Sequence, residues 1–122
     1  SLMSLTATYT PKQLFYGGNE GHKISVTIGT GKQLAVGTVL GIITATGLYD
    51  AYDNGAISGI EVARGILTVA VDTTSAGNNA ATEVPMFVGG ALLNTSALVG
   101  SDSNALTDLG ARAVTSAITY VP

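Results

Sequence analysis

The chain has 122 residues, of which 46% are hydrophobic and only 11% are charged. This length fits a single domain, and a net charge of −3 with only five basic residues, scattered along the chain, argues against nucleic-acid binding, because neutralising phosphates requires a clustered basic surface. The absence of cysteine excludes a disulfide framework and a thiolate metal site.

The apolar residues favour strands over helices. There is no Trp and there are only two Phe, so Val, Ile, Leu and Ala must fill the interior, while sixteen Gly punctuate short apolar runs. No uninterrupted apolar segment approaches the ~20 residues of a membrane-spanning helix, and the N-terminus lacks the features of a signal peptide. We therefore expect a cytoplasmic origin and no membrane partner. Ser1 and Leu2, which precede Met3, are interpreted as a cloning remnant.

The first 23 residues are predicted to form an extended arm. Residues 4–23 show no sustained hydrophobic period and carry one Pro and three Gly around a small apolar group. That group consists of Leu14, Phe15 and Tyr16. Such a segment buries little surface by itself, so it is either tied down on the domain or reserved for a partner.

Strand character begins at residue 24. Ile24, Val26 and Ile28 alternate with polar residues, which is typical of a half-buried strand over 24–28. A turn follows at 29–32. The apolar run over 36–45 is too continuous for one-sided burial, so we predict a fully buried strand that bends at Gly41.

The middle of the chain predicts further strands separated by turns. A short strand over 48–52 precedes Asp53-Asn54-Gly55, in which the Asn-Gly pair is typical of a hairpin turn. The strand predicted over 62–71 contains Gly65, where a bulge or a close backbone approach is expected. After it we predict a polar loop over 72–79 and a strand over 83–93.

One helix is predicted near the C-terminus. Leu106, Leu109, Ala113 and Ala117 recur at intervals of three or four residues, and 101–103 offers capping side chains. A closing strand is expected over 118–121. The predicted fold class is thus mainly β, a small barrel or sandwich with one short C-terminal helix, in a single domain over 24–122.

The sequence offers little catalytic or metal-binding chemistry. Asp50 and Asp53 are three residues apart, which does not fit the alternating ligands of a calcium loop. Gln33 and Leu34 stand where a phosphate loop and a dinucleotide fingerprint need other residues. His22 is the only histidine, so one chain cannot build a triad or a two-histidine site. We therefore expect no enzymatic activity, no metal and no cofactor.

Four segments, taken in order, resemble the lambda-type phage head decoration protein family. They are TPKQLFYG from residue 10, ISVTI from residue 24, TGKQLAVGTVLGIITATGLYDAYD from residue 30, and EVARGILTVAVD from residue 61. Within them, the positions that carry the motif are Gly37, Leu40, Gly41, Gly47, Tyr49, Gly65 and Asp72. The resemblance covers most of residues 10–93.

This resemblance implies a fold of the β-clip or β-tulip kind and a structural function. The family's members assemble as trimers on the outer surface of the mature phage head, and their N-terminal arm reaches onto the major capsid protein. The resemblance thus implies a virion protein, present in the host cytoplasm during assembly, with the capsid protein and itself as partners. The residues that correspond to a capsid-binding arm are Pro11, Leu14, Phe15 and Tyr16.

Two other functions remain open at this point. A carbohydrate- or surface-binding β-module would use Tyr49 and Tyr52 as stacking side chains. A small β enzyme with its active site between subunits would relax the shortage of catalytic groups, although no residue supports it.

Overall fold

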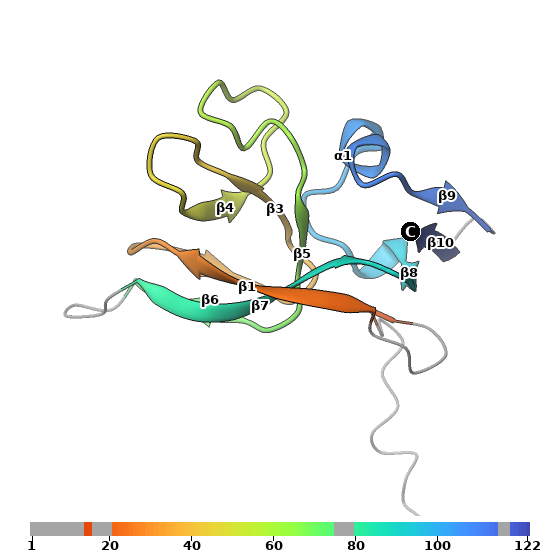
Figure 1. The fold of residues 1–122 in the computed structure, drawn as a ribbon, viewed down its shortest axis with the longest axis horizontal. Helices are drawn as coiled ribbons and strands as arrows, with labels where there is room; N and C mark the ends of the chain where they lie inside the picture. Colours follow the sequence, from red (N-terminus) through yellow and green to blue (C-terminus); the bar gives the residue numbers. More distant parts are fainter. Residues whose placement is uncertain (1–13, 16–20, 75–79, 115–117) are drawn as a thin grey trace, which may run out of the picture.

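The computed structural model describes residues 14–15, 21–74, 80–114 and 118–122, and the fold is mainly β with one short helix, as predicted (Figure 1). The strands are β1 (His22–Ile28), β2 (Gln33–Leu34), β3 (Val39–Ile42), β4 (Tyr49–Ala51), β5 (Gly65–Leu67), β6 (Val71–Asp72), β7 (Ala81–Gly89), β8 (Ala91–Asn94), β9 (Arg112–Ala113) and β10 (Ile118–Val121). A 3-10 turn η2 (Thr95–Ala97) and helix α1 (Ser103–Asp108) lie between β8 and β9. None of the helices in these residues has the length and apolarity needed to span a bilayer.

Five strands close a small barrel in the order β1-β4-β3-β5-β7. The antiparallel pair β1–β7 is its longest ladder, and a single parallel pairing of Ile28 with Tyr49 joins β1 to β4 and completes the closure. Aliphatic side chains fill the barrel, because inward and outward positions alternate along each strand. The buried side chains of the barrel strands are Val26, Ile28, Leu40, Leu67, Val84 and Met86, and Val71 of β6 packs with them.

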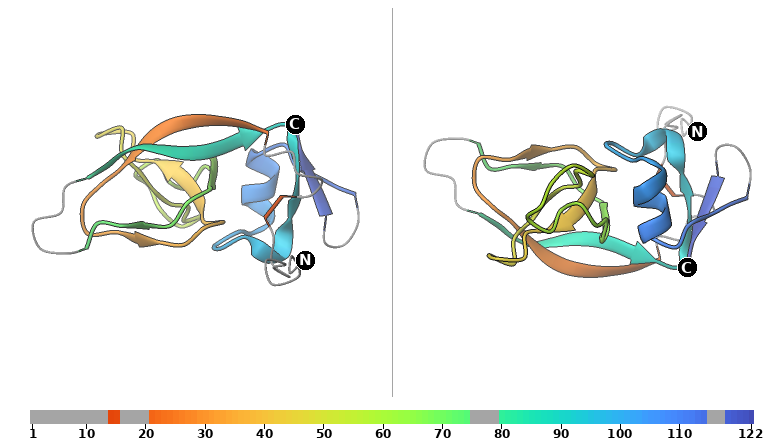
Figure 2. Two further views of the ribbon diagram at one scale, coloured as in Figure 1. Left: turned by 90° about the horizontal axis from the view of Figure 1, so that it is seen from below. Right: turned by 90° about the horizontal axis from the view of Figure 1, so that it is seen from above.

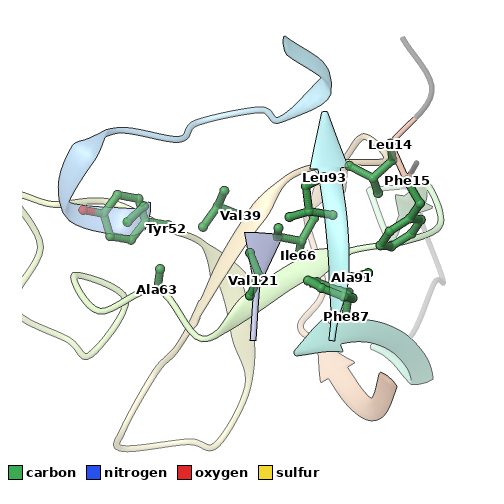
Figure 3. Close-up of a cluster of buried hydrophobic side chains, with 11 residues drawn as sticks. Leu14, Phe15, Val39, Tyr52, Ala63, Ile66, Phe87, Ala91, Leu93 and Val121 are labelled. Carbon is green, nitrogen blue, oxygen red and sulfur yellow. The ribbon is translucent and has the colours of Figure 1, made fainter. Parts of the chain in front are cut away.

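A second layer packs against one end of the barrel (Figure 2). It contains the three-stranded sheet β8-β10-β9 and the helix α1, while β2 and β6 form a separate two-stranded ribbon. A second apolar cluster joins this layer to the barrel (Figure 3). Its buried members are Leu14, Phe15, Val39, Tyr52, Ala63, Ile66, Phe87, Ala91, Leu93, Ala105 and Val121.

The strand predicted over 36–45 is wrong at both ends. Only Val39–Ile42 is a strand, and Val36 has 45% of its surface exposed. After Ile43 the chain turns back at once, because the amide of Gly47 donates to the Ile43 carbonyl at 2.8 Å and the amide of Ile43 to the Leu48 carbonyl at 2.7 Å. The Thr-rich end of the apolar run is therefore the tight connection between β3 and β4. The strands predicted over 24–28, 48–52 and 118–121 are confirmed as β1, β4 and β10.

The two long predicted strands, 62–71 and 83–93, are each divided. The first becomes β5 in the barrel and β6 in the ribbon, so the chain changes sheet between Leu67 and Val71. The second is divided at Gly89 and Gly90, whose φ values of 155° and 89° are open to glycine. This kink carries the chain from β7 in the barrel to β8 in the second sheet.

Two other predictions need correction. Asn54 and Gly55 do form a turn, closed by a 3.1 Å hydrogen bond from the Ala56 amide to the Asp53 carbonyl. This turn lies in the long loop between β4 and β5 and joins no hairpin.

Helix α1 ends at Asp108, because Gly110 adopts a φ of 71° and turns the chain into β9. Ala113 therefore lies in a strand, and Ala117 lies outside the described residues. The N-terminal cap of α1 lies within 101–103, as predicted. It is Asp102, whose Oδ1 accepts a hydrogen bond from the Ala105 amide at 2.8 Å.

One backbone position in β7 is unusual. Between the pairs Val26–Val84 and Ile28–Ala81, one residue of β1 faces two residues of β7, so the ladder contains a bulge at 82–83. Glu83 sits in this bulge with a φ of 56°, in the left-handed region that is unfavourable for a side chain with a Cβ. Its side chain is exposed, so the conformation is imposed by the strand pairing rather than by packing.

Replacing Glu83 should therefore stabilise the fold. We expect Glu83→Asn and Glu83→Gly to raise the free energy of unfolding by about 0.5–1 kcal/mol, because both residues tolerate positive φ. Urea unfolding followed by circular dichroism measures the change. Thr82→Gly, at the exposed neighbour without positive φ, is the control and should destabilise by a similar amount. A lower free energy of unfolding in Glu83→Asn than in the wild type would contradict the inference that the backbone at Glu83 is strained.

Candidate docking surface

Leu14 and Phe15 are packed into the domain rather than presented to a partner. Each has 9% of its surface exposed, and Phe15 pairs with Leu93 as an antiparallel bridge at the edge of β8. The Asn94 amide donates to the Leu14 carbonyl at 2.9 Å. The Phe15 ring meets the Phe87 ring edge to face, with 5.2 Å between centroids (Figure 3).

This packing brings two residues of the predicted arm into contact with the domain predicted over 24–122. Residues 14 and 15 belong to the core, and β1 already begins at His22. Pro11 and Tyr16, the other two residues assigned to a capsid-binding arm, lie outside the described residues. A capsid-binding role for the N-terminal segment stays a prediction, but Leu14 and Phe15 would have to leave the core in order to act as anchors.

An apolar groove lies beside Leu14. It has a volume of about 300 Å³, and among the described residues it is lined by Leu14, Val36, Ser96, Ala97, Leu98 and Val99. None of these side chains is charged. Val36 and Val99 are 45% and 46% exposed, so the groove offers apolar surface to a partner.

The backbone around this groove explains one motif glycine. The amide of Val99 donates to the Gly37 carbonyl at 2.9 Å, and the Val39 amide donates to the Val99 carbonyl at 3.0 Å. Gly37 has a φ of 91°, and a Cβ at this position would collide with the Ala97 carbonyl oxygen. Glycine is therefore required at position 37, where the chain before β3 passes close to Ala97 and Val99. These residues form one wall of the groove.

A second groove, of about 460 Å³, lies beside the β2–β6 ribbon and has one charged side chain in its lining. It is lined by Gln33, Leu34, Ala35, Ala70, Val71 and Asp72. The Asp72 carboxylate accepts hydrogen bonds from the side chain and the amide of Thr74, at 2.5 and 2.9 Å. These bonds stabilise the charged form and lower the pKa of Asp72.

The other motif residues hold the barrel together. Leu40 is fully buried. Gly41 and Gly65 lie at close approaches between two backbone segments. A Cβ on Gly41 would lie 2.6 Å from the Ile60 Cα, and a Cβ on Gly65 would lie 2.5 Å from the Phe87 carbonyl oxygen. Gly47 differs, because its φ of 75° serves the β3–β4 turn and open space surrounds it. The motif therefore encodes backbone geometry more than a binding site.

Tyr49 and Tyr52 do not form an exposed stacking platform. Tyr49 is half-buried against the barrel core, and Tyr52 is 7% exposed with its hydroxyl donating to Asp102 Oδ1 at 2.9 Å. Burial, the hydrogen bond to Asp102 and the nearby negative charges raise the pKa of Tyr52 to about 12. The geometry gives no support to a carbohydrate-binding role for this pair.

The two carboxylates considered in the sequence analysis, and that of Asp108, have structural partners. Asp50 forms a 2.7 Å ion pair with Lys32, and Asp53 Oδ1 accepts from the Gly55 amide at 3.0 Å. Asp108 Oδ2 accepts from the Ala63 amide at 3.0 Å. Within the part of the chain that the structure describes, no group of three or more His, Cys, Asp or Glu side chains could hold a metal ion.

Comparison with known families decides the class of this small β protein. The family model of the bacteriophage lambda head decoration protein D matches residues 5–117, nearly the whole chain. The chain belongs to this family. The comparison with individual curated proteins found no match. The protein is thus a structural decoration protein of a phage capsid, located in the virion, and its family is not a family of enzymes.

In this decoration protein, sequence reasoning missed the groove. Val36 falls in the buried strand predicted over 36–45, and Val99 falls in no predicted element. The signal that would have identified the groove is Gly37, a glycine inside an apolar run, but its partner Val99 lies more than sixty residues further along the chain. Only the fold brings them together.

The motif glycines should differ in their tolerance of a side chain. We expect Gly65→Ala to destabilise the decoration protein by roughly 2–3 kcal/mol, since the Cβ collides with backbone and with Met86. Gly47→Ala should cost only about 1 kcal/mol, from backbone strain without a collision. Chemical unfolding of both variants measures the difference, and equal losses would contradict the close approach of β5 and β7.

Tyr52 should make stability fall at alkaline pH. Its pKa is raised from 10.0 to about 12, so between these values the unfolded chain loses the phenol proton while the folded chain keeps it. Stability contributed by the neutral phenol is complete below pH 10 and is lost as the pH rises toward 12. Melting temperatures recorded across this range should decline less steeply in Tyr52→Phe than in wild type. The control Tyr120→Phe, at an exposed site, should leave the slope unchanged.

Proposed function

We propose that this protein binds as a homotrimer to the outside of the mature phage head, after assembly in the host cytoplasm, and reinforces the capsid against internal DNA pressure. The observation that carries the proposal is the match to the head decoration family over residues 5–117. A trimer that spans neighbouring capsid subunits adds buried interface, and ligands that bind only the assembled state stabilise it by mass action.

The composition of the protein supports this external position. Its net charge of −3 and low content of basic residues suit a surface that does not contact the packaged genome. One buried apolar cluster fills its small barrel and a second joins the barrel to the second sheet, which suits a component that must resist deformation.

The capsid contact is proposed to use the N-terminal segment before Leu14 together with the apolar groove. Leu14 lines the groove, and residues 10–13 directly precede it in the sequence. A capsid strand that paired with residues 10–13 would therefore approach Val36 and Val99, whose exposed side chains could receive an apolar residue of the major capsid protein. Leu14 and Phe15 would fix the root of this segment to β8.

A head-binding experiment tests the function. Purified protein is mixed with undecorated heads of the cognate phage, and bound protein is measured after pelleting. We expect saturable binding by the full chain and strongly reduced binding after deletion of residues 3–13, with folding retained because the core residues Leu14 and Phe15 remain. A chain with residues 3–13 in shuffled order is the matched control for length and composition. Absence of binding by the full chain would contradict the proposed function.

Substitutions in the apolar groove test whether the groove contributes to head binding independently of residues 3–13. Val36→Asp and Val99→Asp should weaken head binding by roughly tenfold or more, because each places a charge in an apolar contact. Ile57→Asp is the charge-matched control, since Ile57 is 98% exposed in the loop between β4 and β5. Unchanged binding would leave the function standing and exclude the groove. A loss of trimer mass in light scattering would instead assign the groove to contacts between copies.

A further inference from the structure

We propose that Asn54 is a site of spontaneous deamidation, promoted by the side chains that surround it in the folded protein. Asn54 is the only asparagine in the sequence that is followed by glycine. Both Asn54 and Gly55 are exposed and occupy the turn between Asp53 and Ala56. The proposal is independent of head binding and concerns the chemical stability of the protein.

The reaction is attack by the Gly55 backbone nitrogen on Cγ of Asn54. The new N–Cγ bond closes a five-membered succinimide ring, and the Cγ–Nδ2 bond breaks, so the side-chain nitrogen leaves as ammonia with the proton from the Gly55 amide. Water then opens the ring at either carbonyl and yields aspartate or isoaspartate. Glycine permits this attack because it has no Cβ to obstruct the ring, and the reacting atoms are already joined through a short chain.

A proton acceptor stands at the attacking nitrogen. The Gly55 amide donates to Asp53 Oδ1 at 3.0 Å, so a carboxylate is in position to receive the proton that the nitrogen must lose. Within hydrogen-bond reach, a carboxylate acts as a general base, and it can return the proton to the leaving ammonia. Asp53 is exposed and remains accessible to water throughout.

A hydrogen-bond donor stands at the oxygen that becomes negative. Asn104 Nδ2, in the first turn of α1, donates to Asn54 Oδ1 at 3.2 Å, and the Tyr52 hydroxyl lies 3.4 Å from the same oxygen while donating to Asp102 at 2.9 Å. A donor at this oxygen stabilises the tetrahedral intermediate as an oxyanion hole does. Base, nucleophile, electrophile and donor are thus gathered in one surface turn.

The product would alter the junction between the loop and the helix. A carboxylate at position 54 adds a negative charge beside Asp53 and close to Asp102, where like charges repel. Isoaspartate also inserts an extra backbone carbon into the turn that the Ala56 amide closes. Aged protein should therefore unfold more easily than fresh protein.

Peptide mapping by mass spectrometry tests the site. The full-length protein is incubated for weeks at mildly alkaline pH, and the amide-to-acid mass change and the isoaspartate content are followed at every asparagine. We expect product at Asn54 well before the other asparagines. Gly55→Ala should slow it by roughly tenfold or more; its Cβ would lie 3.6 Å from Asp53 Oδ1, an ordinary contact, so the turn should persist.

Two further variants test the assistance by neighbours. Asp53→Ser keeps a hydrogen-bond acceptor but removes the base, and Asn104→Ala removes the donor; each should slow the reaction at Asn54 several-fold while circular dichroism shows an intact fold. Formation of product at Asn54 no faster than at other asparagines would overturn the proposal. Equal or faster reaction in both neighbour variants would also overturn it, because their hydrogen bonds would then hold the amide away from attack.

Discussion

The two layers of this decoration protein are held together around one aromatic side chain, Phe87. It is fully buried near the end of β7, at the point where the chain is about to leave the barrel for the second sheet. Its ring meets Phe15, and its carbonyl lies against Gly65 in β5. In an interior that is mostly aliphatic, Phe87 supplies the large surface that joins the barrel, the second sheet and Phe15.

The glycines follow from this arrangement. A Cβ on Gly21 would lie 2.5 Å from the Phe87 ring, and a Cβ on Gly65 would meet the Phe87 carbonyl oxygen. The small residues are therefore needed where the chain passes close to the aromatic anchor, so that backbone replaces side chain as the packing surface. Of the motif glycines, Gly65 has this role beside Phe87, and Gly37 has a comparable role beside the Ala97 carbonyl at the wall of the groove.

Local pattern was sufficient for part of the fold. Strict alternation identified β1, and an isolated apolar run identified β10, because each strand lies within one sheet along its whole length. The long apolar runs over 62–71 and 83–93 were each predicted as one strand but contain two, because hydrophobicity does not show where a chain passes from one sheet to another. Gly89 and Gly90 marked one such passage, but their φ values depend on tertiary pairing.

The candidate site was less accessible to sequence reasoning than the fold. The apolar residues of the N-terminal segment suggested anchors for a partner, yet Leu14 and Phe15 satisfy the core of their own domain. The exposed apolar side chains, Val36 and Val99, come from segments that neither periodicity nor composition connects. Hydrophobicity alone does not distinguish an apolar residue that packs internally from one that a partner covers.

The acidic side chains at the two ends of α1, Asp102 and Asp108, stabilise the helix, and their spacing in the sequence does not indicate this role. A helix of six residues is too short to be stable alone. Asp102 caps its first turn and receives the Tyr52 hydroxyl, while Asp108, at its last residue, receives the Ala63 amide. Both carboxylates thereby tie the helix to the loop between β4 and β5. Because these bonds concentrate negative charge around Tyr52, the same junction that secures the helix tolerates further negative charge poorly, and this makes the neutral amide of Asn54 important to it.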